Sequence, residues 1–353
     1  MTSHDDHGAA SSSTASARRS PDAPPSRRSA KLDKHDLAAR SRSALESRRF
    51  LFITGKGGVG KTTVSGALAT AYAARGKRVL VALANAKERL SAILGTAPIG
   101  DSIVPAGHNI WAVNLSPETA LLEYGELILK VKSVTRAVFD NRYTKTFFRA
   151  VPGLFEWAML GKAWFHTTEK LPNGENRFDI VLFDAPATGH GLDMLRVPKV
   201  ILDVVPPGVL RRDAETAWAM FRDPVRSGVV VVTLPEEMPT TETIELVRSI
   251  QGELGLPVLE LIANGVLPRL FSAEERTALA SRPELLDVLA PSMSAGTGRS
   301  ALVAGARRAV REQVQVESLA RLALEISVPM IELPFLFDEA STVQGTRMLA
   351  SKL

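Results

Sequence analysis

The sequence contains no cysteine among its 353 residues, so disulfide bonds, thiolate metal sites and cysteine nucleophiles are excluded. No apolar run approaches the roughly 18 uncharged residues that a membrane-spanning helix needs. No hydrophobic signal sequence follows the start. We therefore expect a chain without an integral membrane segment and with a cytoplasmic location.

Beyond the N-terminal region the chain also lacks an excess of charge of one sign. The formal net charge is +5, and residues 1–49 hold ten basic and six acidic residues, which leaves 33 basic against 32 acidic residues. This near-neutral body does not favour a nucleic-acid-binding surface. Residues 1–47 lack apolar periodicity and predict a disordered tail. An electrostatic tether and an organelle transit peptide are less favoured interpretations of this tail, because acids are scattered through it.

The chain is organised around a glycine-rich loop. Residues 50–63 read FLFITGKGGVGKTT, an apolar run followed by the spacing Gly55-x-x-x-x-Gly60-Lys61-Thr62, and residues 64–75 have helix-forming composition. This is a P-loop, in which backbone N–H groups cradle phosphates, a lysine adds charge and a threonine hydroxyl reaches Mg²⁺. The predicted nucleotide-binding residues are Gly55, Lys56, Gly57, Gly58, Val59, Gly60, Lys61, Thr62 and Thr63.

A second lysine, Lys56, follows the first glycine of the loop. A side chain there points away from the phosphates of its own subunit, so we expect it to reach a nucleotide held by a facing subunit. The alternative is that Lys56 is an ordinary solvated lysine next to a glycine. The loop resembles the deviant Walker A box of a P-loop group that includes cell-division and partition ATPases and the arsenite-pump ATPase. In those families the early lysine acts across a dimer.

Apolar runs predict the strands of a parallel sheet. Continuous runs cover residues 78–84, 178–185, 228–234 and 257–264, with shorter candidates at 109–115 and 329–334. Asp184 ends one run at the sheet edge where ligands bind, and we expect it to hold Mg²⁺ together with Thr62. The N–H of Gly189 is predicted to contact a γ-phosphate. The sequence therefore predicts an α/β P-loop NTPase with a doubly wound, mostly parallel sheet and a helical insertion.

The domain organisation follows from the same pattern. We expect a single ATPase domain over residues 48–345, with a helical subdomain at roughly 118–170 and further helices at 191–226, 241–252 and 272–326. An aromatic and methionine-rich cluster in the helical region could line a groove for an apolar protein client, although helix-on-sheet core is the favoured interpretation. The residues that support this client-binding hypothesis are Trp157, Met159, Trp164, Phe165, Met194, Trp218 and Met220.

The segment after Asp184 narrows the resemblance. Residues 184–190 read DAPATGH and resemble the switch II segment of the arsenite-pump and tail-anchored-protein-targeting ATPases, that is, the anion-transporting ATPase family. The resemblance implies a dimeric, ATP- and Mg²⁺-dependent ATPase in which His190 is a switch element. It also implies that Asn264 reads adenine and that Pro334 and Phe335 close the base pocket.

Three departures limit what the resemblance implies. The family has an aspartate in switch I that orients the attacking water, whereas residues 83–90 read LANAKERL. Asn85 could position water but cannot accept its proton, and Glu88 could substitute if the loop folds inward; the alternative is a solvated first helical turn. The absence of cysteine rules out arsenite bound through sulfur and a cysteine zinc clasp between subunits. Only one P-loop is present, so if Lys56 acts across a dimer the chain must pair with itself or with a paralogue.

The leading hypothesis is thus a dimeric ATP hydrolase with Lys56, Lys61, Asn85 and Glu88 as candidate catalytic residues, hydrolysis being slow without the aspartate. The alternative is a hydrolysis-impaired ATP-binding scaffold, or a client-binding chaperone, in a homodimer or in a heterodimer with a paralogue.

Overall fold

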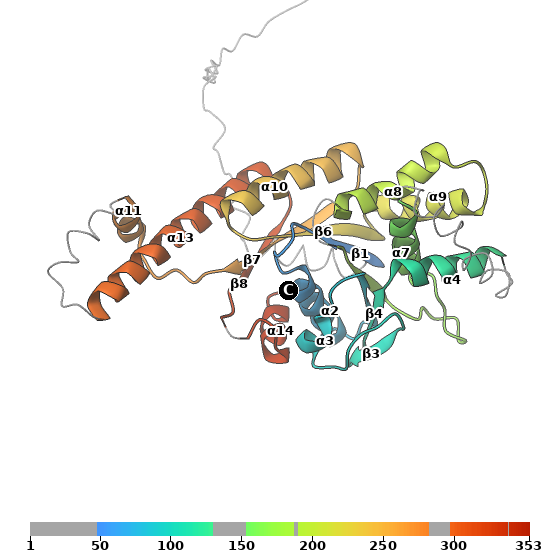
Figure 1. Cartoon of the computed structure of the whole chain (residues 1–353), viewed down its shortest axis with the longest axis horizontal. Helices are drawn as coiled ribbons and strands as arrows, with labels where there is room; N and C mark the ends of the chain where they lie inside the picture. The colour runs from blue at the N-terminus through green and yellow to red at the C-terminus, as the bar shows by residue number, and fades with distance from the viewer. Residues whose placement is uncertain (1–47, 130–152, 187–189, 282–296, 338) are drawn as a thin grey trace, which may run out of the picture. The chain divides into compact units, whose positions relative to one another are not determined.

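A twisted eight-stranded sheet lies at the centre of the described residues (Figure 1). The computed structural model describes residues 48–129, 153–186, 190–281, 297–337 and 339–353. The strand order is β3-β4-β2-β5-β1-β6-β7-β8, and β3 and β4 are antiparallel while the other neighbours are parallel. The predicted α/β class with a mostly parallel sheet is confirmed. The strands are β1 Phe50–Thr54, β2 Val79–Ala84, β3 Val104–Gly107, β4 Ile110–Leu115, β5 Ile180–Asp184, β6 Ser227–Thr233, β7 Val258–Val266 and β8 Met330–Pro334.

The central strands are apolar along their whole length because both faces of the sheet are covered. Every residue of β1, β2, β5 and β6 is buried. Successive side chains point to opposite faces, so Phe50 and Phe52 join one core cluster and Leu51 and Ile53 the other. Each fully buried side chain of this kind stabilises the fold by about 1.5–3 kcal/mol.

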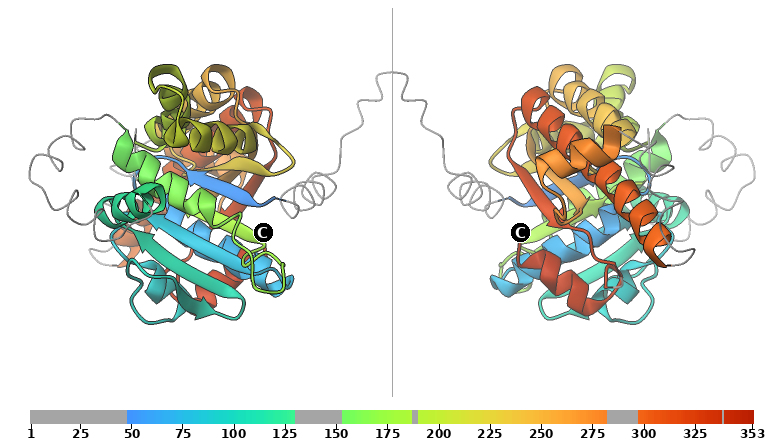
Figure 2. Two further views of the ribbon diagram at one scale, coloured as in Figure 1. Left: turned by 90° about the vertical axis from the view of Figure 1, so that its right-hand side faces the viewer. Right: turned by 90° about the vertical axis from the view of Figure 1, so that its left-hand side faces the viewer.

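Helices form a layer on each face of the sheet (Figures 1 and 2). One layer contains α2 Lys61–Ala74, α3 Leu90–Leu94 and α14 Val343–Ala350. The opposite layer contains α4 Pro117–Leu129, α7 Leu154–Phe165, α8 His190–Val204, α9 Val209–Arg222, α10 Glu237–Arg248 with the π-helical turn Ser249–Glu253, and α13 Thr297–Glu325, on which α11 Ala273–Ser281 packs. No helix in the described ranges is both long and apolar enough to cross a membrane.

Several details differ from the expectations. Helix α10 begins at Glu237, not Thr241, because Pro239 falls in its first turn, where the missing N–H leaves no intrahelical bond unmade. Strand β3 was not expected, since its residues are not continuously apolar. Helix α14 continues past residue 345 and packs on α2. The predicted tail 1–47 lies outside the described residues, as do residues 130–152 of the predicted helical subdomain and residues 282–296 of the predicted range 272–326.

Candidate functional site

The P-loop connects β1 to α2 at the carboxyl edge of the sheet. Three of its glycines have positive φ, and two of these, Gly55 at +148° and Gly60 at +90°, also lie against a neighbouring strand. A Cβ on Gly55 would lie 2.1 Å from the Val232 carbonyl oxygen, and one on Gly60 would lie 2.3 Å from Nδ2 of Asn264. Both positions therefore require glycine on two grounds, the backbone conformation and the close approach of neighbouring strands. This fixes the loop against β6 and β7.

Lys61, the first residue of α2, closes over the loop. Its Nζ donates hydrogen bonds to the carbonyl oxygens of Gly55 and Lys56, both at 3.0 Å, and the residue is 7 % exposed. Burial lowers the pKa of Lys61, although the nearby Asp184 carboxylate partly offsets this. An ammonium has three N–H donors, so one stays available for a phosphate oxygen within the loop.

Asp184 ends β5 beside the loop, because β5 pairs with β1 in a register that sets Ile53 opposite Asp184. Thr62 Oγ1 donates to Asp184 Oδ2 at 2.7 Å. The carboxyl group is almost completely buried, which raises the pKa of Asp184 to about 6 despite the Thr62 hydrogen bond, the Lys61 charge and the nearby Ser65 hydroxyl.

The pair of oxygens on Thr62 and Asp184 fits Mg²⁺. Both are hard oxygen donors, which this ion prefers. The second carboxyl oxygen, Oδ1 of Asp184, is buried and accepts no hydrogen bond of normal geometry from a described residue. A buried carboxylate oxygen of this kind is satisfied by a cation or by water held on a cation. The predicted magnesium residues thus lie together, in a setting suited to the ion.

A cavity of about 640 Å³ opens in front of the loop. Gly58, Gly60, Lys61, Thr62 and Thr63 line it from the P-loop side, Asp184 and Pro186 from β5, and residues 84–89 from the loop after β2. Positive charge from Lys61, Lys87 and Arg89 faces this space, which suits a phosphate chain.

The loop after β2 places Asn85 and Glu88 in the cavity wall. Asn85 is exposed and has φ +47°, a conformation that asparagine tolerates better than most residues. Glu88 is tied to the start of α3: Oε1 accepts from the N–H of Ser91 at 2.7 Å and Oε2 from its hydroxyl at 2.6 Å. Oε1 of Glu88 therefore satisfies a backbone N–H in the first turn of α3, and Oε2 is engaged by a side chain.

Sequence reasoning missed two further residues, one that supports this wall from behind and one that lines it. Asn114 in β4 pairs with the backbone of Ala86 in both directions, accepting from its N–H at 3.1 Å and donating to its carbonyl at 2.9 Å. An asparagine in the otherwise apolar strand Ile110–Leu115 was the available signal. Ser341, ahead of α14, lines the same cavity, and no local pattern marks it.

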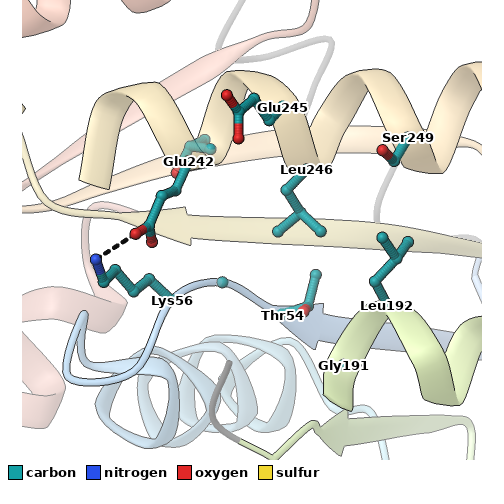
Figure 3. A pocket seen from close by; sticks show the side chains of 10 residues that line it. Thr54, Lys56, Gly191, Leu192, Glu242, Glu245, Leu246 and Ser249 are labelled. Atoms are coloured by element: carbon teal, nitrogen blue, oxygen red, sulfur yellow. Dashed lines mark hydrogen bonds and ion pairs between the residues drawn. The ribbon is translucent and has the colours of Figure 1, made fainter. Parts of the chain in front are cut away.

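Lys56 contacts a different part of the chain (Figure 3). Its Nζ forms an ion pair with Glu242 of α10 and lies 3.0 Å from Sδ of Met238. The two charged side chains are 25 % and 43 % exposed, and both line a second cavity of about 410 Å³ between the loop, α8 and α10. Lys56 therefore does not contact the phosphate cradle of its own chain, as expected, but it has a partner within the chain that the sequence did not indicate.

The residues predicted for the base pocket lie on β7 and at the end of β8. Asn264 donates from Nδ2 to the carbonyl of Val59 at 2.9 Å, so its amide holds the P-loop. Phe335 is 43 % exposed, and its ring packs edge-on against Phe337 at 4.8 Å between centroids. Reading of adenine by Asn264, Pro334 and Phe335 stays a prediction. Gly189 and the His190 side chain lie outside the described residues.

Comparison with known proteins agrees with this geometry. Residues 48–206 match the anion-transporting ATPase family. Over 315 residues the chain is 24% identical to ATPase BagA of Mycobacterium tuberculosis, which covers 84% of this chain and 90% of that protein. It is 27% identical over 248 residues to an arsenical pump-driving ATPase of Escherichia coli, covering 65% of this chain and 42% of the pump protein. It is also 28% identical over 250 residues to an arsenical pump-driving ATPase of Acidiphilium multivorum, a match that covers 66% of this chain and 41% of that protein.

The chain thus spans less than half of these pump-driving relatives and most of the mycobacterial one. The matched residues 48–206 contain the P-loop, the loop after β2 and Asp184, the three parts that surround the cavity. On these grounds residues 48–206 are similar to the anion-transporting ATPase family.

Proposed function

We propose that the protein is a Mg²⁺-dependent ATP hydrolase that works as a nucleotide-driven switch. The observation that carries this proposal is the contact between Thr62 and Asp184, 2.7 Å apart, directly beside the buried Lys61. A P-loop lysine, a hydroxyl and a strand-end carboxylate at one sheet edge are the parts that phosphoryl transfer from a nucleoside triphosphate requires.

Each residue has a defined role in this proposal. The backbone N–H groups of the P-loop bind the phosphates, and the remaining donor of Lys61 neutralises charge on them. Thr62 and Asp184 hold Mg²⁺, which supplies charge neutralisation on the phosphate oxygens. Lys87 and Arg89 at the cavity wall favour entry of the anionic nucleotide.

The proposal includes a dimer in which Lys56 acts on the nucleotide of the facing subunit. This role rests on the resemblance of the loop and on the direction of the side chain, away from its own phosphate cradle. Lys56 must leave Glu242 to fulfil it, so the ion pair belongs to the resting chain. Because the pair is partly exposed, breaking it costs only about 0.5–1 kcal/mol.

A second candidate function is a nucleotide-gated scaffold that binds ATP with little turnover. It is supported by the loop after β2, where Asn85 replaces the aspartate and both oxygens of Glu88 are engaged by Ser91. In this case a paralogue in a heterodimer would supply the group that orients water.

A chaperone function for apolar clients has less support. Trp157, Met159, Met194 and Met220 are buried, between 0 % and 5 % exposed, as the core interpretation of the cluster expects. Only Phe165 in the proposed set is a largely exposed side chain, at 40 %.

The test is Mg²⁺-dependent ATP hydrolysis, nucleotide affinity and solution mass of the full chain and of three variants. Lys61→Ala should abolish nucleotide binding, Lys56→Ala should retain binding and lose turnover together with ATP-dependent dimerisation, and Lys199→Ala, an exposed lysine on α8, should match the wild type. Binding without turnover in the wild type would favour the scaffold instead. If Lys61→Ala retains both nucleotide binding and turnover, both proposals are overturned.

A further inference from the structure

A partly enclosed cavity of about 420 Å³ lies among α4, α7 and α9, away from the P-loop. Its walls are mainly apolar, with several aromatic rings. Tyr124, Trp157, Trp164, Phe165, His166 and Asp213 are among the lining residues. A cavity of this size and character suits a small molecule with an apolar body.

Two polar groups in the wall have spare hydrogen-bonding capacity. Asp213 accepts a hydrogen bond from the Tyr124 hydroxyl at 3.2 Å and has no ion-pair partner within the described ranges. Burial and the Asp213 charge raise the pKa of Tyr124, so the phenol stays protonated and donates. The negative charge of Asp213 is therefore not neutralised by a cation of the described residues.

His166 is the second polar group. The residue is 6 % exposed, and its Nδ1 lies 2.7 Å from a carboxylate oxygen of Glu169. Although burial opposes ionisation, the bond to His166 and the charge of Arg177 lower the pKa of Glu169, so this carboxylate accepts and Nδ1 donates. The other ring nitrogen, Nε2, is buried and has no hydrogen-bond partner among the described residues.

The other charges around the cavity are already paired. Lys162 contacts Glu123 at 2.7 Å, and Glu169 contacts Arg177 at 3.2 Å. Among the described residues, the wall thus offers one carboxylate without an ion pair and one buried nitrogen without a hydrogen bond, surrounded by indole and phenyl rings whose faces attract cations. A complementary ligand must donate hydrogen bonds, carry positive charge and bring an apolar body.

We propose that this cavity binds a small apolar ammonium ion, a primary amine with an aromatic or aliphatic arm. The ammonium group bonds to Asp213, and the arm packs among Trp157, Trp164 and Phe165. The proposal is independent of the ATPase function, because none of these residues lines the nucleotide cavity.

The experiment uses three probes of similar shape and different charge: 2-phenylethylammonium, neutral 2-phenylethanol and anionic 3-phenylpropanoate. Calorimetry gives affinity and stoichiometry for the full chain at pH 7, and tryptophan emission reports on the site, since Trp157 and Trp164 line it. We expect saturable binding of one ammonium ion per chain, with the alcohol and the carboxylate weaker by about tenfold or more.

Two variants localise the binding. Asp213→Asn keeps the shape and removes the charge, and should weaken the ammonium ion by about tenfold or more while leaving the alcohol unchanged. Asp203→Asn, on the exposed side of α8 and outside the cavity wall, should behave as the wild type. Circular dichroism and nucleotide affinity, unchanged in both variants, establish that they fold. Equal affinity for the three probes, an unaffected Asp213→Asn variant, or no saturable binding up to about 10 mM would overturn the proposal.

Discussion

Asp184→Asn is expected to make the ligand-free protein more stable at pH 7 while abolishing Mg²⁺-dependent turnover. The Asp184 carboxyl is almost completely buried, and burial raises its pKa from 3.8 to about 6. Because the pKa is raised in the folded state, ionisation of Asp184 lowers the free energy of unfolding. The contribution of this group is fully favourable below pH 3.8 and is lost as the pH rises through about 6.

The size of the stability change follows from the pKa shift of Asp184. A difference of roughly two pKa units corresponds to about 3 kcal/mol at pH 7. Asparagine removes this cost and can still accept the hydrogen bond from Thr62, but Lys61 loses the carboxylate that offsets its own burial. The expected net gain is therefore about 1–2 kcal/mol, enough to raise the midpoint of thermal unfolding by a few degrees.

Urea unfolding at pH 4 and pH 7 measures this gain, which should vanish near pH 4. Asp179→Asn, at the other end of β5, is the matched control. Burial opposes ionisation there too, but hydrogen bonds from Arg78 outweigh it and lower the pKa of Asp179, so this substitution should destabilise the protein at pH 7. A loss of stability in Asp184→Asn that is equal at both pH values would show that buried charge is not what sets the cost. Retained Mg²⁺-dependent turnover would refute the role of Asp184 at the metal.

Three further outcomes are expected. Glu242→Gln removes the ion-pair partner of Lys56. Because formation of a symmetric dimer would break two such pairs, the ATP-dependent dimer of this variant should be about five- to thirtyfold tighter by sedimentation. Glu245→Gln, on the same cavity wall, is the control and should leave dimerisation unchanged. Gly60→Ala strains a residue at φ +90° and forces a clash with a neighbouring strand, so titration should show nucleotide binding at least about tenfold weaker in a chain that still folds. Glu88→Gln should lower the unfolding free energy by about 1 kcal/mol through the α3 cap and leave turnover nearly unchanged, whereas a general base would lose about 10²-fold in kcat.

The parts of the site that depend on local pattern could be predicted from the sequence. A glycine-rich spacing between a strand and a helix specifies a phosphate cradle whatever surrounds it. An apolar run that ends in aspartate specifies a carboxylate at the sheet edge. The register of β1 and β5 then brings Thr62 and Asp184 together, because both strands end at the same level.

The parts that depend on long-range packing could not be predicted. Glu242 lies 186 residues from Lys56 along the chain, on a helix with no charge pattern that marks it. The edge strand β3 is half-exposed and carries no apolar run. The Asn264 amide was assigned to the base by resemblance, but its bond to the Val59 carbonyl arises from how closely β7 approaches the loop. Each of these contacts is fixed by the three-dimensional fold alone.

The P-loop is held from both sides of β1, and the contacts differ in how easily they can change. On the β5 side, the buried carboxylate of Asp184 accepts a hydrogen bond from the hydroxyl of the half-buried Thr62. On the β6 and β7 side, Gly55 packs against a backbone carbonyl and Asn264 bonds to another. These contacts are short, directional and largely shielded from water, so breaking any of them leaves a polar group unpaired at a cost of about 1–3 kcal/mol. The ion pair of Lys56 with Glu242 is different, because both side chains keep access to water and each charge can be solvated or transferred to a phosphate without an unpaired intermediate. In the proposed dimer, a nucleotide on the facing subunit would therefore compete first for this contact, and loss of the pair would act on the rest of the fold through α10.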